Sequence, residues 1–155
     1  LIDVAKILAD KGVVSDLKIV GGGQDYDMLK QRIETLELQQ NVLLCGNVDN
    51  VEVYLHESDM YVHSSLSEAL GLTIIEAMAA GLPVVMLDGR GNRDLIVQGK
   101  NGYMVYEQNA EQFADRILEI WNDKQKYCQM SAFAQDFAQQ YDIKPYVDRL
   151  LELYC

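Results

Sequence analysis

The chain has 155 residues, of which 49% are hydrophobic and 24% are charged. These values are typical of one ordinary globular domain with a core of its own. The formal net charge of −11 argues against nucleic acid or an anionic membrane as the main partner, because both are polyanions. A small anionic ligand stays compatible with this charge, since backbone N–H groups and a few basic side chains can hold a phosphate locally.

The three cysteines, Cys45, Cys128 and Cys155, are far apart in the sequence. No Cys-x-x-Cys pair or Cys/His cluster accompanies them, which argues against a zinc site and against a disulfide framework. We therefore expect no metal and a reduced, cytoplasmic chain. No stretch resembles a signal peptide, and the longest apolar run, residues 77–87, is too short to span a bilayer.

Short apolar runs alternate with segments of helical periodicity along the chain. In chain order the patterns predict a helix over 1–11, a strand over 17–20, a helix over 25–38, a strand over 42–45, a helix over 50–57, a strand over 60–63, a helix over 71–81, a strand over 84–87, a short helix over 92–98, a strand over 102–105, and helix from 109 onward with breaks near Lys124 and Tyr141.

Nearly all-apolar strands between helices predict a doubly wound α/β domain, with a parallel sheet covered on both faces. An apolar-rich amphipathic stretch over 141–155 predicts a helical C-terminal tail. Leu1 stands in place of a methionine and already belongs to a helical pattern, so we expect a fragment of a longer protein. Ligands bind at the carboxyl ends of the strands in such sheets. The loops at 21–24, 46–50, 64–71 and 88–92 are therefore the candidate binding loops.

The segment from Ser64 to Val85 carries the strongest chemical signal. It leaves a strand, passes through small polar residues and enters a helix near Gly71, where free N–H groups and the lack of a Cβ favour an anion. Glu68 precedes this helix, and Glu76 lies in its second turn. Helical spacing places Thr73 and Glu76 on one face, so two carboxylates could flank one ligand.

Plainer readings of the same residues stay open. Glu76 could be a solvated helix residue, and Glu68 could be a carboxylate that favours the helix start electrostatically. Gly21-Gly22-Gly23 lacks the full dinucleotide fingerprint and is as compatible with a tight turn as with ligand contact.

Three further polar residues near strand ends admit two readings each. His63 is more typical of a packed core histidine than of a ligand-binding one. Arg90 and Arg93 flank Gly91-Asn92 at a strand end, which suits a phosphate as well as it suits ordinary surface arginines.

Glu68 and Glu76 are separated by seven residues, and the whole segment resembles the E-x7-E signature of family-4 retaining glycosyltransferases, which have the GT-B fold. Further blocks resemble this family in the family's order: Val20–Gly23, Asn41–Val48, Asp59–Ser65, Gly81–Val85 and Gly99–Val105. The likeness covers about residues 1–125. One departure is His63-Ser64, which stands where Pro-Ser is more usual.

The resemblance implies that residues 1–155 form a single domain, the C-terminal, nucleotide-sugar-binding half of the enzyme. The first strand and the acceptor-binding N-terminal half are then absent, together with an Arg and a Lys that stabilise the leaving diphosphate. The resemblance further implies that Glu68 is the catalytic candidate and contacts the sugar, that Glu76 binds the ribose, and that no metal or other cofactor is needed. The donor-binding residues that it implies are Gly22, Ser67, Glu68, Gly71, Leu72, Thr73 and Glu76.

The function implied is transfer of a sugar, with retention, from a nucleotide sugar (UDP- or GDP-linked) to a carbohydrate or lipid-linked acceptor. We expect the fragment alone to be inactive and any peripheral membrane contact to lie in the missing half. One alternative is a GT-B nucleotide-sugar epimerase. A flavodoxin-like binding domain is less favoured, because Val20 is followed by glycines and lacks the acidic cluster of that class.

Overall fold

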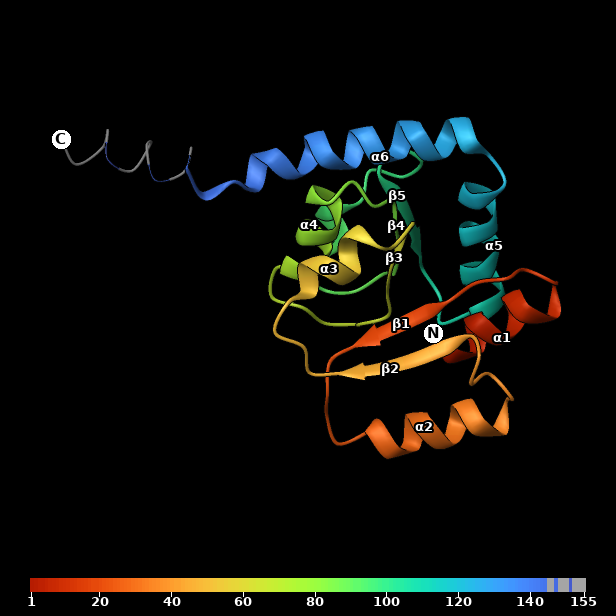
Figure 1. Ribbon diagram of the computed structural model, residues 1–155. Coiled ribbons are helices and arrows are strands. Elements are labelled where there is room, and N and C mark those ends of the chain that lie inside the picture. The colour runs from red at the N-terminus through yellow and green to blue at the C-terminus, as the bar shows by residue number, and fades with distance from the viewer. Residues whose placement is uncertain (145–146, 148–150, 152–155) are drawn as a thin grey trace.

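The computed structural model describes residues 1–144, 147 and 151. The helices are α1 (Ile2–Asp10), α2 (Tyr26–Thr35), α3 (Val51–His56), α4 (Leu72–Ala79), η1 (Arg93–Leu95), α5 (Ala110–Trp121), α6 (Lys124–Ala138) and η2 (Gln139–Tyr141), where η marks a 3₁₀ turn. The strands are β1 (Leu17–Val20), β2 (Val42–Gly46), β3 (Tyr61–His63), β4 (Val84–Leu87) and β5 (Gly102–Val105). The alternation of strands and helices confirms the predicted α/β class (Figure 1).

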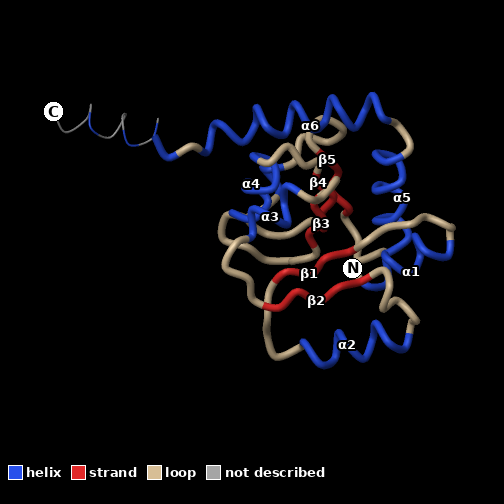
Figure 2. Tube along the Cα trace, viewed as in Figure 1, coloured by secondary structure: helices blue, strands red, loops and turns tan. Residues whose placement is uncertain are grey.

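All strand pairs in the described residues are parallel, but they form two sheets and not one continuous sheet. β1 pairs with β2, while β4 lies between β3 and β5 (Figure 2). The groove between the two sheets has a volume of about 700 Å³ and is lined by both β1 and β3. Periodicity predicts the strands, but the division of the sheet depends on which strands meet in space.

The hydrophobic core lies on both sides of β4, whose residues Val84, Val85 and Met86 are inaccessible to solvent. One cluster joins β4 to α4 and α6, and another joins it to α1, α5 and β5. Burial on both faces of a short strand is what an all-apolar parallel strand requires. Helices α2 and α6 lie at opposite ends of the molecule (Figure 1).

Helix α1 packs in two directions at once. Its residues Ile2 and Ala5 belong to a separate apolar cluster with α2 and β2. Its residues Val4 and Leu8 belong to the cluster of β4, β5 and α5. Because its apolar residues occupy more than one face, α1 packs against both sheets at once.

The short helix predicted over 92–98 is only the 3₁₀ turn Arg93–Leu95. Ile96 is already extended (φ −103°, ψ 120°), and the N–H of Val97 is bonded at 2.8 Å by the side chain of Asn101. A side-chain acceptor thus takes the place of a helical carbonyl.

The breaks predicted in the C-terminal part are present, because α5 ends at Trp121 before α6 begins at Lys124. At the second break η2 ends at Tyr141, and Asp142 is extended. The tail helix predicted over 141–155 lies mostly outside the described residues, and it stays a prediction.

Candidate functional site

The loop from β3 to α4 ends at Gly71, which adopts a left-handed conformation (φ 61°, ψ 47°) at the start of the helix. A Cβ at this position would lie 2.6 Å from Oδ1 of Asn92 and 3.1 Å from side-chain atoms of Ile74 and Leu95. Both the dihedral angles and the lack of space therefore demand glycine here. The N–H groups of Leu72 and Thr73 follow at a helix end that has no side-chain cap.

The same loop is held by the backbone of the loop after β4. The N–H of Glu68 donates to the carbonyl of Arg90 at 2.9 Å, and the N–H of Arg90 donates to the carbonyl of Leu66 at 3.1 Å. A Cβ on Gly91 would lie 2.0 Å from the carbonyl oxygen of Glu68. The close approach allowed by this glycine fixes the position of Glu68 relative to α4.

Helix α4 is buried on one face and open on the other. Ile74, Ala77 and Met78 have no solvent exposure. Thr73 and Glu76, three positions apart, are exposed and line the groove between the sheets. The apolar pattern of the helix thus turns its hydroxyl and carboxylate toward the groove.

A polar cluster surrounds His63 at the carboxyl end of β3. Tyr61 Oη lies 3.0 Å from Thr73 Oγ1 and 3.4 Å from His63 Nδ1, and the rings of Tyr61 and His63 are stacked. On the other side of the imidazole, His63 Nε2 lies 3.5 Å from Glu68 Oε1. Burial holds the pKa of His63 below its usual value, and the charge of Glu68 opposes that effect. Burial likewise raises the pKa of Tyr61.

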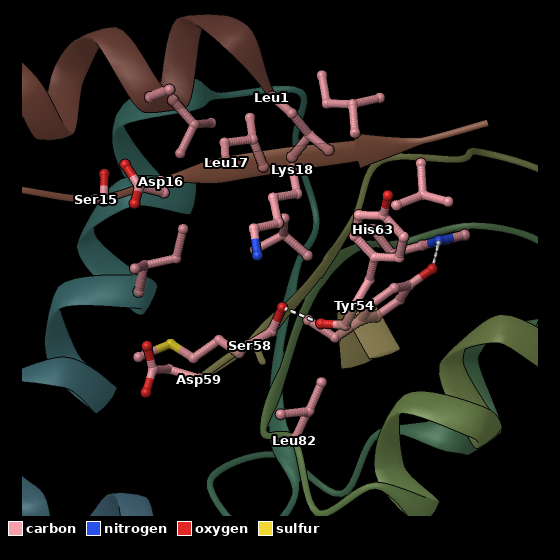
Figure 3. A pocket seen from close by; sticks show the side chains of 18 of the residues that line it. Leu1, Ser15, Asp16, Leu17, Lys18, Tyr54, Ser58, Asp59, His63 and Leu82 are labelled. Carbon is pink, nitrogen blue, oxygen red and sulfur yellow. Dashed lines mark hydrogen bonds between the residues drawn. The ribbon is translucent and has the colours of Figure 1, made fainter. Parts of the chain in front are cut away.

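The groove beside this cluster has charged groups as well as apolar walls (Figure 3). Lys18 of β1 contacts Glu57 at 2.9 Å, which joins the two-stranded sheet to the segment before β3. Leu1 also lines the groove.

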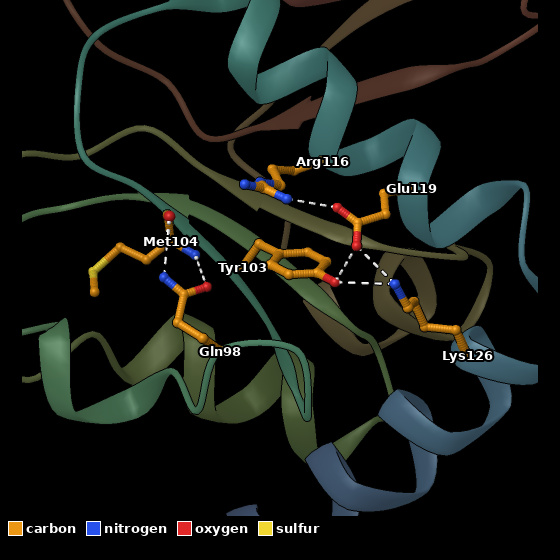
Figure 4. A network of polar contacts seen from close by, with 6 residues as sticks. All are labelled: Gln98, Tyr103, Met104, Arg116, Glu119 and Lys126. Atoms are coloured by element: carbon orange, nitrogen blue, oxygen red, sulfur yellow. Dashed lines mark hydrogen bonds and ion pairs between the residues drawn. The ribbon is translucent and has the colours of Figure 1, made fainter.

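A second polar network lies on α5, α6 and β5 (Figure 4). Glu119 accepts hydrogen bonds from Lys126 at 2.7 Å, from Arg116 at 2.6 Å and from the hydroxyl of Tyr103. Lys126 and then Tyr103 are the main causes that lower the pKa of Glu119 from 4.5 to about 2. Because each of its members is hydrogen-bonded within the network, we interpret this network as a structural one that holds α5, α6 and β5 together.

Comparison with known proteins matches residues 1–137 to the glycosyl transferases group 1 family. The chain belongs to this family. It is 32% identical over 133 residues to a poly(glycerol-phosphate) α-glucosyltransferase of Bacillus subtilis, and the match covers 85% of this chain and 20% of that protein. It spans about a fifth to two fifths of the length of the first curated relatives that it matches.

Two solved structures illustrate the likeness. Staphylococcus aureus TarM, in complex with fondaparinux, α-GlcNAc-glycerol and UDP, superposes with a TM-score of 0.87 at 30% identity, over 99% of this chain and 31% of TarM. Anabaena HepE, in complex with UDP-glucose, gives a TM-score of 0.86 at 27% identity, over 99% of this chain and 43% of HepE. The Rossmann-like fold predicted from the resemblance is confirmed, and the family counts against the flavodoxin-like alternative.

The structure brings together most of the predicted donor-binding residues of this group 1 glycosyl transferase domain. Ser67 and Glu68 lie on the loop between β3 and α4, where the backbone of Ser67 forms an isolated β-bridge with that of Arg90. At the start of α4 follow, in order, Gly71, Leu72, Thr73 and Glu76. Gly22 belongs to the loop after β1, on the other sheet, where a Cβ would lie 2.9 Å from Oδ1 of Asn47. Their roles in binding stay predictions.

Sequence reasoning undervalued two side chains of this site and gave no role to a third. His63, interpreted mainly as a core residue, is buried beside Glu68. Tyr61 links it to Thr73. Asn92 is inaccessible to solvent, and neither atom of its amide is hydrogen-bonded within the described residues. The alternation Tyr61-Val62-His63 on one strand was the available signal for the first two, since such residues share a face.

Of the two arginines at the end of β4, Arg93 is engaged by Asp88 through contacts of 2.5 and 2.9 Å. Within the described part of the chain, no group of three His, Cys, Asp or Glu side chains is placed to hold a metal ion. The helices described there also include none that is long and apolar enough to cross a bilayer.

Proposed function

We propose that this chain is the nucleotide-sugar-binding domain of a retaining glycosyltransferase, with UDP- or GDP-linked sugar as donor. The observation that carries the proposal is the start of α4, which has no side-chain cap after the left-handed Gly71. Glu68 lies in the loop just before this helix start, and Glu76 lies in the helix itself. An uncapped helix start favours a diphosphate. Complexes of the solved relatives with UDP and UDP-glucose favour uridine as the base.

In this arrangement each residue takes a distinct part of the donor. Glu76 accepts hydrogen bonds from the ribose hydroxyls, the backbone at Gly71 and Leu72 binds the diphosphate, and Thr73 contacts the sugar. Glu68 contacts the sugar near the reacting carbon and is the catalytic candidate, and Ser67 and Gly22 complete the donor site. During transfer, the bond between the anomeric carbon and the diphosphate oxygen breaks. The acceptor hydroxyl bonds to that carbon and loses its proton, and the nucleoside diphosphate leaves.

We further propose that residues 1–155 form one domain, the C-terminal half of a two-domain enzyme that acts in the cytoplasm. The groove between β1 and β3 supports this proposal, because a further parallel strand lying there could pair with both sheets and join them. The acceptor glycan, and any peripheral membrane contact, would then be handled by the other half.

Thermal unfolding with UDP, GDP, ADP and their sugars tests the donor site. A ligand at 100 times its Kd stabilises the native state by about 2.7 kcal/mol, which corresponds to a rise of roughly 5–11 °C in Tm for a domain of this size. We expect a uridine or guanosine nucleotide to raise Tm, and Glu76→Gln to abolish the rise. Glu34→Gln, the same charge change on the exposed face of α2, is the matched control.

If no nucleotide raises the Tm, two explanations are possible, and a longer chain distinguishes them. The same titration on a chain extended upstream of Leu1 should restore binding if the missing strand and basic residues supply affinity. Silence there too would refute the donor site. Product analysis of the complete enzyme with and without acceptor distinguishes transfer from epimerisation, because only an epimerase converts the nucleotide sugar into an isomeric nucleotide sugar.

A further inference from the structure

The hydrogen-bonding state of His63 can be deduced from its neighbours. Its side chain is only 11% exposed, and its Nε2 is buried and makes no hydrogen bond among the described residues. Glu68 Oε1 lies 3.5 Å from that nitrogen, slightly beyond hydrogen-bond length. Which ring nitrogen of His63 carries the proton therefore decides whether Nε2 attracts or repels the carboxylate of Glu68.

Two neutral forms of the imidazole are available, and the carboxylate discriminates between them. If Nδ1 carried the proton, the lone pair of Nε2 would face the negative charge of Glu68, which is repulsive. If Nε2 carries the proton, it points a donor at Glu68, and Nδ1 accepts from the Tyr61 hydroxyl at 3.4 Å. Tyr61 Oη then accepts from Thr73 Oγ1 at 3.0 Å, since either hydroxyl of that pair can be the donor.

We propose that His63 is a positioning residue for the donor-sugar site, holding the carboxylate of Glu68 through Nε2–H and coupling it through Tyr61 to the hydroxyl of Thr73. The chain Thr73–Tyr61–His63–Glu68 connects the start of α4 to the loop before it by side chains alone. Closing the 3.5 Å gap to a charge-assisted bond requires only a small movement of Glu68, which is partly exposed.

The part of the inference that concerns the sugar rests on the proposed function, whereas the contact between His63 and Glu68 does not. A positioning role of this kind fixes the orientation of the carboxylate that meets the sugar. It should therefore affect a nucleotide sugar more than the free nucleotide, which ends at the diphosphate.

Imidazole NMR of the ligand-free chain tests the contact. The chain has two histidines, and the variant His56→Gln, at an exposed position of α3, assigns the imidazole signals of His63. We expect His63 to carry its proton on Nε2 at neutral pH and its pKa to lie below the usual value of an imidazole. Glu68→Gln should lower the pKa of His63 further, because it removes the charge that favours the imidazolium. A proton on Nδ1, or a His63 pKa indifferent to Glu68→Gln, overturns the proposal.

Two substitutions of His63 test the effect on the sugar, with His56→Gln as control. The amide nitrogen of His63→Gln can occupy the place of Nε2, whereas that of His63→Asn can replace only Nδ1. We expect the Kd for UDP-glucose to rise about tenfold in His63→Asn and less than threefold in His63→Gln, with the Kd for UDP unchanged in both. An equal loss of UDP and UDP-glucose, or no loss at all, refutes the positioning role. If neither the wild-type chain nor the chain extended upstream of Leu1 binds UDP or UDP-glucose, the proposed function fails, and the NMR result still decides the contact.

Discussion

Replacing Gly71 with alanine perturbs the start of α4 in two separable ways. The left-handed backbone (φ 61°) costs an alanine about 1 kcal/mol relative to glycine. The new Cβ, 2.6 Å from Oδ1 of Asn92 and 3.1 Å from two apolar side chains, adds about 1–3 kcal/mol of overpacking. We therefore expect a loss of about 2–4 kcal/mol in the free energy of unfolding, or roughly 5–15 °C in Tm.

Two other glycines provide matched controls for urea denaturation monitored by circular dichroism. Gly12→Ala has the same backbone strain (φ 76°) with no atom within 4 Å of the added Cβ, so it isolates the cost of the conformation. Gly23→Ala has open space and no unusual φ, and should be nearly neutral. Asn92→Ala removes the atom closest to the new Cβ, so it should recover about 1 kcal/mol of the overpacking cost of Gly71→Ala in a double-mutant cycle. A cost for Gly71→Ala no larger than that of Gly12→Ala would refute the steric argument.

Three further predictions concern the polar network at Glu119 and the protein interior. Glu119→Gln should lower the free energy of unfolding by about 1–2 kcal/mol at neutral pH, allowing for solvent screening of a partly exposed group. Because the pKa of Glu119 in the folded state is about 2, its stabilising effect is complete above pH 4.5 and is lost as the pH falls toward 2. Denaturation curves of the variant and the wild type should therefore converge in acid, and a difference independent of pH would contradict this account. Asn101→Ala leaves the Val97 N–H and the Leu95 carbonyl without their partners, and should cost about 2–3 kcal/mol in urea denaturation, a loss under 0.5 kcal/mol being inconsistent with that account. Ile74→Ala, at a site with no solvent exposure, should lower stability by about 2–5 kcal/mol in the same assay, and a neutral result would mean that the site collapses around the smaller side chain.

Local patterns in the sequence predict the elements well, because short apolar runs and glycine ends are properties of neighbouring residues. The strand Val84–Leu87 and the helix that begins after Gly71 are examples. The helix expected over 92–98 was wrong because the side chain of Asn101, several residues further on, bonds the N–H of Val97. Periodicity does not report such a competing acceptor.

The candidate site shows the same division. The spacing of Glu68 and Glu76 places them around one helix start from sequence alone. The approach of Gly91 to the carbonyl of Glu68 and of Asn92 to Gly71 depends on two loops that meet only when β3 and β4 pair. The position of His63 against Glu68 follows from the same pairing, which non-local contacts decide.

The double packing of α1 determines how the domain should open. The unit formed by β1, β2 and α2 has its own small apolar cluster and no strand pairing with β3–β5 in the described residues. The two faces of α1 and the ion pair between Lys18 and Glu57 are therefore main links between the two units. Native-state hydrogen exchange should then show two levels of protection. The amides of β1 and β2 should exchange through a sub-global opening, whereas those of β4 should exchange only through global unfolding. A strand that filled the groove would merge the two levels into one.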